Sequence, residues 1–144
     1  MYKRILIAAE NSPTDRAVIE HVQELARLTG AQLVIVHVAD GWAARNYDQL
    51  DLRESEEMRA DRAYLEGLRQ ELIGRGFEVD TRLGMGDPAS EIARAAEEEH
   101  ADLIALATHG HRFVKDVLLG ATADRLRHLV DIPVLLVRSK KRKA

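Results

Sequence analysis

The sequence predicts a doubly wound α/β fold, in which an open sheet of five parallel strands lies between two layers of helices. Five short apolar runs alternate along the chain with four segments of helical periodicity. Most of these runs are apolar at every position, which is typical of parallel strands buried on both faces. Strict alternation with right-handed crossovers then gives a three-layer architecture.

The first two strands are expected at residues 5–9 and 33–38, where both runs are continuously apolar. Ser12 is a suitable N-cap for the intervening helix, with Pro13 at its first helical position. Gly30 ends that helix. The sequence therefore opens with one complete βα unit and a second strand.

The polar stretch 40–52 has no clear periodicity, and we expect a loop there. A long amphipathic helix follows and ends at Gly74 and Gly76. The third strand, 77–83, alternates apolar with charged residues, which indicates one exposed face and a place near a sheet edge.

Residues 84–88 are predicted to turn into a third helix, and the fourth strand is expected at 103–107. Its exit loop is 108–111, and 133–137 is the fifth strand. The helix between them is expected to bury Val117, Leu118, Leu126, Leu129 and Val130.

The length of 144 residues is that of one domain. We assign residues 1–138 to this domain and 139–144 to a basic tail, interpreted as solvated rather than as a binding arm. A hydrophobic content of 46% with only 4% aromatic residues predicts an aliphatic core.

The composition also excludes several functions. A net charge of −3 gives no general attraction to nucleic acid or to anionic membranes, so neither is an expected partner. The absence of cysteine excludes disulfides, zinc thiolates and iron–sulfur clusters. No apolar run is long enough for a membrane span or a signal peptide, and we expect a cytoplasmic protein.

No catalytic or metal-binding set is apparent. His109 and His111 are two imidazoles without convergent carboxylates, so we predict no metal site. Ser12 lacks the context of a nucleophile elbow, and there is no Walker lysine, so no catalytic residue is assigned. His37 lies inside an apolar run and is expected to be a packed core histidine rather than a base.

Ligands of doubly wound sheets bind beyond the carboxyl ends of the strands, where the strand order reverses. After the fourth strand, Gly110 and Gly120 are separated by nine residues. Glycines so placed let the backbone approach anionic oxygens, although a turn and a helix contact would also explain them. His111, Arg112 and Lys115 could add positive charge there or form a solvated basic face.

The chain resembles the universal stress protein family over nearly its whole length. The features that carry the resemblance are segments 4–12, 36–40 and 86–88, Thr108-His109-Gly110 with Leu118-Leu119-Gly120, and segment 133–138. The resemblance implies a five-stranded sheet in the order 3-2-1-4-5 and a homodimer.

One branch of that family binds ATP through three glycines followed by serine or threonine. Gly110 and Gly120 match the second and third glycines, and Val38 stands where a backbone contact to the nucleotide is expected. Ala107 replaces the first glycine, where its methyl would crowd the phosphates, and Ala121 replaces the hydroxyl residue. Glu10 stands where an aspartate usually meets the nucleoside.

Thr122 could supply the missing hydroxyl, although one residue turns it about 100° around a helix. The candidate cofactor is ATP, with Mg²⁺ only as a companion of the bound nucleotide. The candidate nucleotide site comprises Ala8, Ala9, Glu10, Val38, Leu106, Ala107, His109, Gly110, Gly120, Ala121 and Thr122.

Three functions remain open: an ATP-dependent dimeric switch in the stress response, a nucleotide-free interaction module, and a weak nucleotide hydrolase. The expected dimer forms through Pro133 to Val137, because pairing protects an apolar edge strand from aggregation. Leu135 is the residue we expect to face the partner if its side chain points outward.

Overall fold

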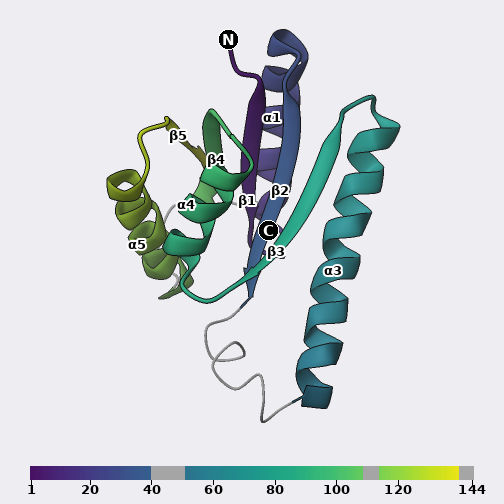
Figure 1. The fold of residues 1–144 in the computed structure, drawn as a ribbon, viewed down its shortest axis with the longest axis vertical. Helices are drawn as coiled ribbons and strands as arrows, with labels where there is room; N and C mark the ends of the chain where they lie inside the picture. Colours follow the sequence, from purple (N-terminus) through teal and green to yellow (C-terminus); the bar gives the residue numbers. More distant parts are fainter. Residues whose placement is uncertain (40–50, 109–113, 140–144) are drawn as a thin grey trace, which may run out of the picture.

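The computed structural model describes residues 1–39, 51–108 and 114–139, and for 51–55 and 114–120 it describes the backbone alone. Within these residues the chain has the expected doubly wound α/β architecture, with helices on both faces of one sheet (Figure 1). The stretch 40–50, the loop 109–113 and residues 140–144 lie outside the described residues.

The sheet has five parallel strands in the order β3-β2-β1-β4-β5, as the family resemblance implied. The strands are β1 (Arg4–Ala9), β2 (Gln32–Ala39), β3 (Val79–Met85), β4 (Leu103–Thr108) and β5 (Val134–Arg138). The chain builds outward from β1 to β3 and then returns to the other side of β1 with β4. The switch point therefore lies between β1 and β4.

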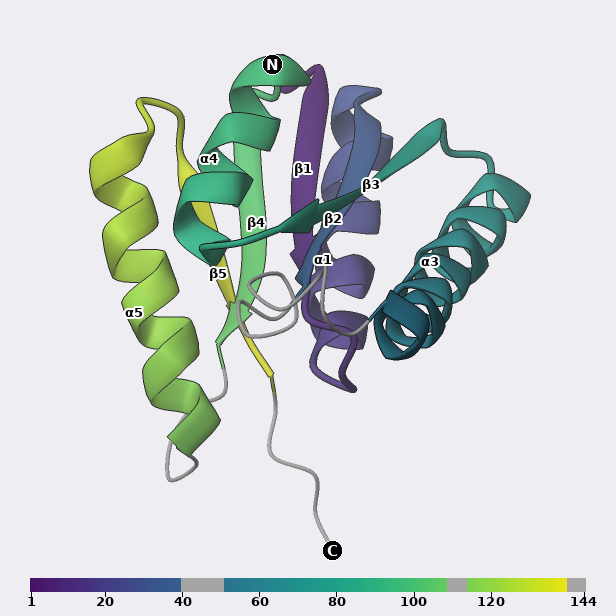
Figure 2. The same cartoon turned by 60° about the horizontal axis from the view of Figure 1, so that its bottom comes forward.

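In the part of the chain that the structure describes, two helices cover each face of the sheet (Figure 2). One face carries α1 (Asp15–Thr29) and α3 (Asp51–Gly74), and the other carries α4 (Pro88–Glu98) and α5 (Val114–Leu129). No helix in the described part of the chain is long and apolar enough to cross a membrane.

The alternation of side chains along the strands divides the buried residues into two cores. Ile5 and Ile7 of β1 pack in the core on the α1 side, whereas Leu6 and Ala8 pack in the core on the α4 side. Complete burial of one aliphatic side chain contributes about 1.5–3 kcal/mol to folding. Both faces of β1 are thus stabilised, which fixes its carboxyl end at the centre of the molecule.

The start of α1 differs from the prediction. The helix begins at Asp15 after Thr14, so Ser12 is not its N-cap and Pro13 is not in its first turn. The Asp15 carboxylate instead accepts hydrogen bonds from the backbone N–H groups of Glu10, Asn11 and Ser12, at 2.8–3.3 Å. The loop therefore folds around Asp15, and the helix begins only after it.

Three further expectations were wrong in detail. The third strand begins at Val79 and continues to Met85, because β2 pairs with it as far as Ala39. The fifth strand is displaced by one residue and ends at Arg138. Leu129 was expected in the core, but it is 49% exposed at the end of α5.

Candidate functional site

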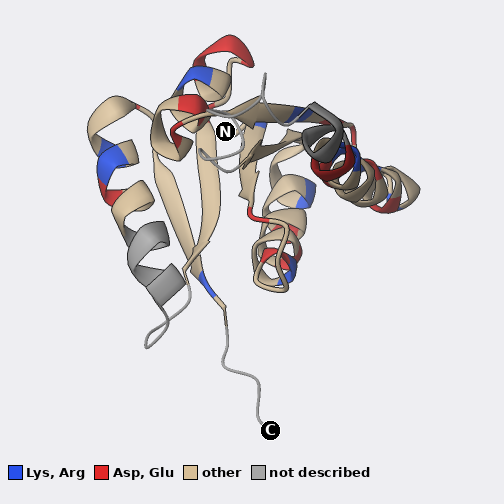
Figure 3. Cartoon of the chain, turned by 90° about the horizontal axis from the view of Figure 1, so that it is seen from below, with Lys and Arg blue, Asp and Glu red and all other residues tan. Residues whose placement is uncertain are grey.

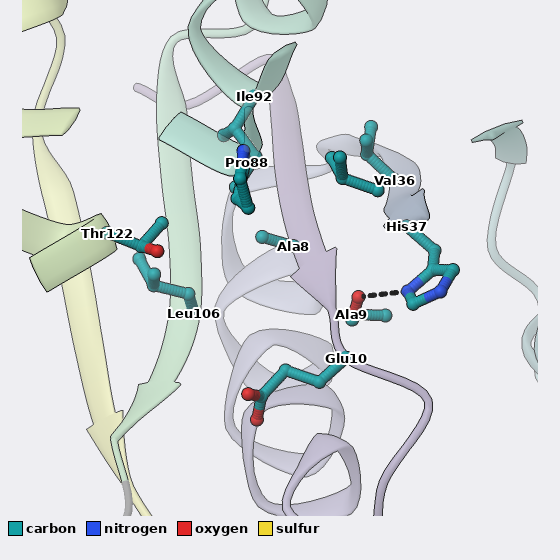
Figure 4. A pocket seen from close by; sticks show the side chains of 10 residues that line it. Ala8, Ala9, Glu10, Val36, His37, Pro88, Ile92, Leu106 and Thr122 are labelled. Atoms are coloured by element: carbon teal, nitrogen blue, oxygen red, sulfur yellow. Dashed lines mark hydrogen bonds between the residues drawn. The ribbon is translucent and has the colours of Figure 1, made fainter. Parts of the chain in front are cut away.

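A cavity of about 320 Å³ opens at the carboxyl ends of β1, β2 and β4, beside the switch point (Figure 4). The side chains around it are mostly apolar, with a few polar groups, as in many small-molecule sites. Its lining residues are Ala8, Ala9, Glu10, Val36, His37, Val38, Pro88, Ile92, Leu106 and Thr122.

The cavity lies on the α4 and α5 face of the sheet. Ala8 and Leu106 belong to the core on that face, and Ile92 of α4 packs in the same core. Thr122 of α5 closes the side opposite β2 (Figure 4). Because Ala8 carries only a methyl group at the centre of the sheet, the space between the two helices is left open.

Glu10 lies at the edge of the cavity, immediately after β1 (Figure 4). Its carboxylate accepts a hydrogen bond of 2.7 Å from the hydroxyl of Thr14, and Ser12 Oγ lies 2.7 Å from the same hydroxyl. These contacts hold the carboxylate in place. A carboxylate accepts hydrogen bonds from sugar hydroxyls and amino groups, and it repels phosphates.

His37 lies in the wall of the cavity rather than inside the core, where the sequence had suggested it. Its Nδ1 is 2.9 Å from the carbonyl oxygen of Ala9, and Nε2 is 3.5 Å from Asp61 of α3. Because a carbonyl oxygen only accepts, Nδ1 carries the proton. The imidazole thus joins the ends of β1 and β2.

A second cavity, of about 430 Å³, adjoins the first on the side of α3 and shares Glu10, His37 and Val38 with it. The other charged residues in its lining are Glu57 and Asp61. A space with three carboxylates suits hydrogen-bond donors and is unfavourable for phosphate.

The first turn of α4 forms another wall of the main cavity, and it is tied to α5. Asp87 caps α4 by accepting a hydrogen bond of 3.0 Å from the Ser90 N–H, and it pairs with Arg125 of α5 at 2.6 Å. Hydrogen bonds from Ser90, together with Arg125, lower the pKa of Asp87 to about 2. The two helices that flank the cavity are therefore connected at its rim.

The structure brings six residues of the predicted site together. Ala8, Ala9, Glu10, Val38, Leu106 and Thr122 all line the main cavity. His109 and Gly110 lie outside the described residues, and Gly120 is described only as part of the α5 backbone.

Two predicted residues are placed elsewhere. Ala107 is 1% exposed and packs in the core on the α1 side, so its methyl does not crowd the cavity, contrary to our expectation. Ala121 is exposed, whereas Thr122 lines the cavity. The rotation between consecutive helical residues thus turns Thr122, rather than Ala121, toward the cavity.

The sequence prediction missed Val36, His37, Pro88 and Ile92 as lining residues. Val36 could have been predicted from the sequence, because it precedes Val38 by two positions and so lies on the same face of the strand. Pro88 and Ile92 depend on how α4 packs against the sheet, which no local pattern specifies.

Comparison with known proteins supports one family. The model of the universal stress protein family matches residues 1–138. Universal stress protein MJ0577 of Methanocaldococcus jannaschii is 27% identical, with 97% of each chain covered, and its structure superposes with a TM-score of 0.85 over 99% of each chain.

Two more distant structures share the fold and contain nucleotides. A universal stress protein in complex with cAMP has 18% identity and a TM-score of 0.69, over 96% of this chain and 98% of that one. The universal stress protein of Archaeoglobus fulgidus in complex with dAMP has 23% identity and a TM-score of 0.66, over 94% and 98%. On the match of residues 1–138 to the family model, the chain belongs to the universal stress protein family.

Proposed function

We propose that the main cavity binds ATP and that the protein is a cytoplasmic, dimeric module of the stress response whose interactions depend on that nucleotide. The observation that carries the proposal is the cavity itself. It lies at the switch point of the sheet, and six residues of the predicted nucleotide site line it.

The lining suggests how the nucleotide lies. The base contacts Val38 at the end of β2, the sugar hydroxyls donate to Glu10 after β1, and the phosphates extend past β4 toward the start of α5. The relatives that contain cAMP and dAMP support an adenine nucleotide as the class of ligand. Mg²⁺ is expected only as the ion bound to the phosphates of ATP.

Thr122 takes the role that the family pattern gives to the residue after the third glycine. Its side chain lies in the cavity wall on α5, on the side where the phosphates leave the nucleoside. The burial of Ala107 on the other face of the sheet removes the steric objection to phosphate binding. Two of the three departures from the ATP-binding pattern, Ala107 and Ala121, are therefore compatible with ATP binding.

The dimer is proposed to form through β5, which is an edge strand of the sheet. Leu136 is 49% exposed on this strand, whereas Leu135 packs against the core and does not face outward. An exposed apolar edge is protected when it pairs with a second copy. Because β5 is adjacent to β4, a ligand at the end of β4 is one strand from the dimer edge.

The test is to purify the protein without added nucleotide, denature it, and separate the released small molecules by chromatography, followed by calorimetric titration of the stripped protein. We expect ATP, ADP or AMP in the released fraction and one ATP site per chain. Neither release nor binding at millimolar ATP would favour the nucleotide-free interaction module. Conversion of bound ATP to ADP during the titration would favour the weak hydrolase.

A further inference from the structure

The hydroxyl of Thr14 does not serve the helix at whose start it lies. Thr14 occupies the N-cap position of α1, yet its side chain forms no hydrogen bond to the start of the helix. A threonine that caps a helix has extended backbone angles, whereas Thr14 has φ −67° and ψ −20°. The first helical N–H groups instead bond to the carbonyl oxygens of Ser12 and Pro13, at 3.1 and 3.3 Å. The helix therefore does not need this hydroxyl.

The hydroxyl of Thr14 is directed at the carboxylate beside the main cavity. It donates its proton to Oε2 of Glu10 at 2.7 Å, because an ionised carboxylate only accepts. Thr14 Oγ1 also lies 2.7 Å from Ser12 Oγ, and since its one proton goes to Glu10, Ser12 is the donor in this contact. Ser12 Oγ accepts in turn from the N–H of Thr14 at 3.4 Å. The hydrogen bonds thus run in one direction, from Ser12 through Thr14 to Glu10.

Glu10 depends on such a donor to stay in place. Together with Asp15 it puts two carboxylates on the short segment between β1 and α1, where Figure 3 shows acidic residues in red. Like charges repel, and a glutamate side chain has several rotatable bonds, so an unsupported Glu10 would adopt many positions. Asp15 has its own donors, the N–H groups of the loop and Tyr64. Thr14 supplies the donor that keeps the Glu10 carboxylate at the edge of the cavity (Figure 4).

We propose that Thr14, supported by Ser12, is a positioning residue that holds the Glu10 carboxylate for the sugar hydroxyls of the bound nucleotide, so that the site prefers ribonucleotides to deoxyribonucleotides. This inference rests on the proposed nucleotide function. A hydrogen bond from a sugar hydroxyl to a carboxylate contributes about ten- to a hundredfold in affinity. A carboxylate that must first be ordered loses part of that gain. The sugar preference is therefore the property that Thr14 controls.

The experiment measures the affinities of the full chain for ATP, 2′-deoxy-ATP and 3′-deoxy-ATP by calorimetric titration. Thr14→Val removes the hydroxyl and keeps the shape of the side chain, whereas Thr14→Ser keeps the hydroxyl. Ser12→Ala removes the donor behind Thr14. Thr29→Val is the matched control, because Thr29 ends α1 and its hydroxyl bonds to the carbonyl oxygen of Leu25 at 2.9 Å, far along the helix from the cavity.

We expect the parent to bind ATP about tenfold more tightly than at least one of the two deoxynucleotides. Thr14→Val should weaken ATP binding about fivefold and change the affinity for that deoxynucleotide less than twofold. Ser12→Ala should have the same selective effect at about twofold, since the hydrogen bond from Thr14 to Glu10 remains but loses its support. Thr14→Ser and the control should keep the preference of the parent, and circular dichroism should show that every variant is folded.

Equal weakening of all three nucleotides in Thr14→Val would overturn the inference, because it would show a general loosening of the loop. An unchanged sugar preference in that variant, or a parent that binds ATP and both deoxynucleotides alike, would overturn it too, while the proposed function would stand. If Thr14→Val does not fold, the presence or absence of the selective loss in Ser12→Ala decides the question. If the parent binds none of the three nucleotides, both the inference and the proposed function fail.

Discussion

Asp15 is 2% exposed and accepts hydrogen bonds from three consecutive backbone N–H groups, those of Glu10, Asn11 and Ser12. Tyr64 of α3 donates a fourth, at 2.5 Å. Burial and this hydrogen bond raise the pKa of Tyr64, so the phenol stays protonated and remains a donor. One carboxylate thus shapes the loop that presents Glu10 to the cavity.

Replacing Asp15 with alanine should therefore lower the free energy of unfolding by about 3 kcal/mol, because several donors lose a charged acceptor. Tyr64→Phe removes one donor and should cost about 1 kcal/mol. Urea unfolding of both variants measures the difference. Equal losses would show that the backbone contacts of Asp15 contribute nothing.

Thr122 and Ala121 are a matched pair for testing the phosphate contact. Thr122→Ala should weaken ATP binding about tenfold, since a hydrogen bond to a charged oxygen contributes about 1.5–3 kcal/mol. Thr122→Ser keeps the hydroxyl and should bind like the parent. Ala121→Ser should have no effect, because Ala121 is exposed outside the cavity. Calorimetry that shows tighter binding for Ala121→Ser would reverse this assignment.

Sequence patterns predict some of these residues and not others. Glu10 and Val38 directly follow or end apolar runs, so their place at the mouth of the sheet was predictable. The choice between Ala121 and Thr122 depends on the rotation of α5 about its axis, which packing determines. The role of Asp15 was missed because three of its partners are backbone groups, which have no sequence signature, and the fourth, Tyr64, is distant in the sequence.

At the level of elements, the rim of the cavity depends on the connection between α4 and α5. Asp87 caps α4 through Ser90 and pairs with Arg125. A second ion-pair network lies at the amino end of the sheet, where Arg4 of β1 contacts Asp80 of β3 and Glu99 after α4. These contacts hold the helices in register with the strands.

Asp87→Ala should lower the stability at pH 6 by about 1 kcal/mol through loss of the cap, whereas Asp87→Asn should cost less, because asparagine caps equally well. The measurement is urea unfolding at pH 6. The pair with Arg125 is exposed and contributes little. Equal losses for the two variants would show that the ion pair, rather than the cap, is what matters.

The lowered pKa of Asp87 also makes the stability of the protein depend on pH. The pKa of Asp87 is about 2 in the folded protein and near 3.8 ordinarily, so the unfolded chain binds more protons between these values. The contribution of the Asp87 carboxylate to the free energy of unfolding is complete above about pH 5 and is lost as the pH falls through 2. The stability difference between the parent and Asp87→Asn should therefore shrink from pH 5 to pH 2, and a constant difference would contradict the assignment.

The elements themselves were largely predictable. Continuous apolar runs identified the buried strands, and alternation in β3 correctly indicated an edge strand. The boundaries were less accurate where pairing extends a strand beyond its apolar residues. Gly84 and Met85 were predicted as a turn, but they pair with Val38 and Ala39 of β2.

At the scale of the whole molecule, β5 is the edge proposed to join two copies. Replacing Leu136 with lysine should convert the dimer into a monomer, because the charge would have to be buried against the partner strand. Leu129→Lys is the matched control, since it is equally exposed but lies on α5. Sedimentation velocity at micromolar concentration checks both. A monomeric parent, or a dimer unaffected by Leu136→Lys, would contradict the proposed interface.

The overall arrangement was predicted from two kinds of sequence information. Alternation of strands and helices gave the layers, and the family resemblance gave the strand order that places the switch point between β1 and β4. The cavity itself was not predictable, because its volume depends on the separation of α4 and α5 above the small side chain of Ala8.

The most direct test of the account is a methyl NMR titration of the protein with ATP, in which the position of each perturbed methyl group reports the binding site. We predict saturable shifts at Ile92, Thr122 and Val38, which line the main cavity, and none at Ile73 at the end of α3. The amino end of the sheet has a separate cavity that contains Arg27 and Arg75. Shifts confined to residues around that cavity, or no shifts at millimolar ATP, would contradict the account.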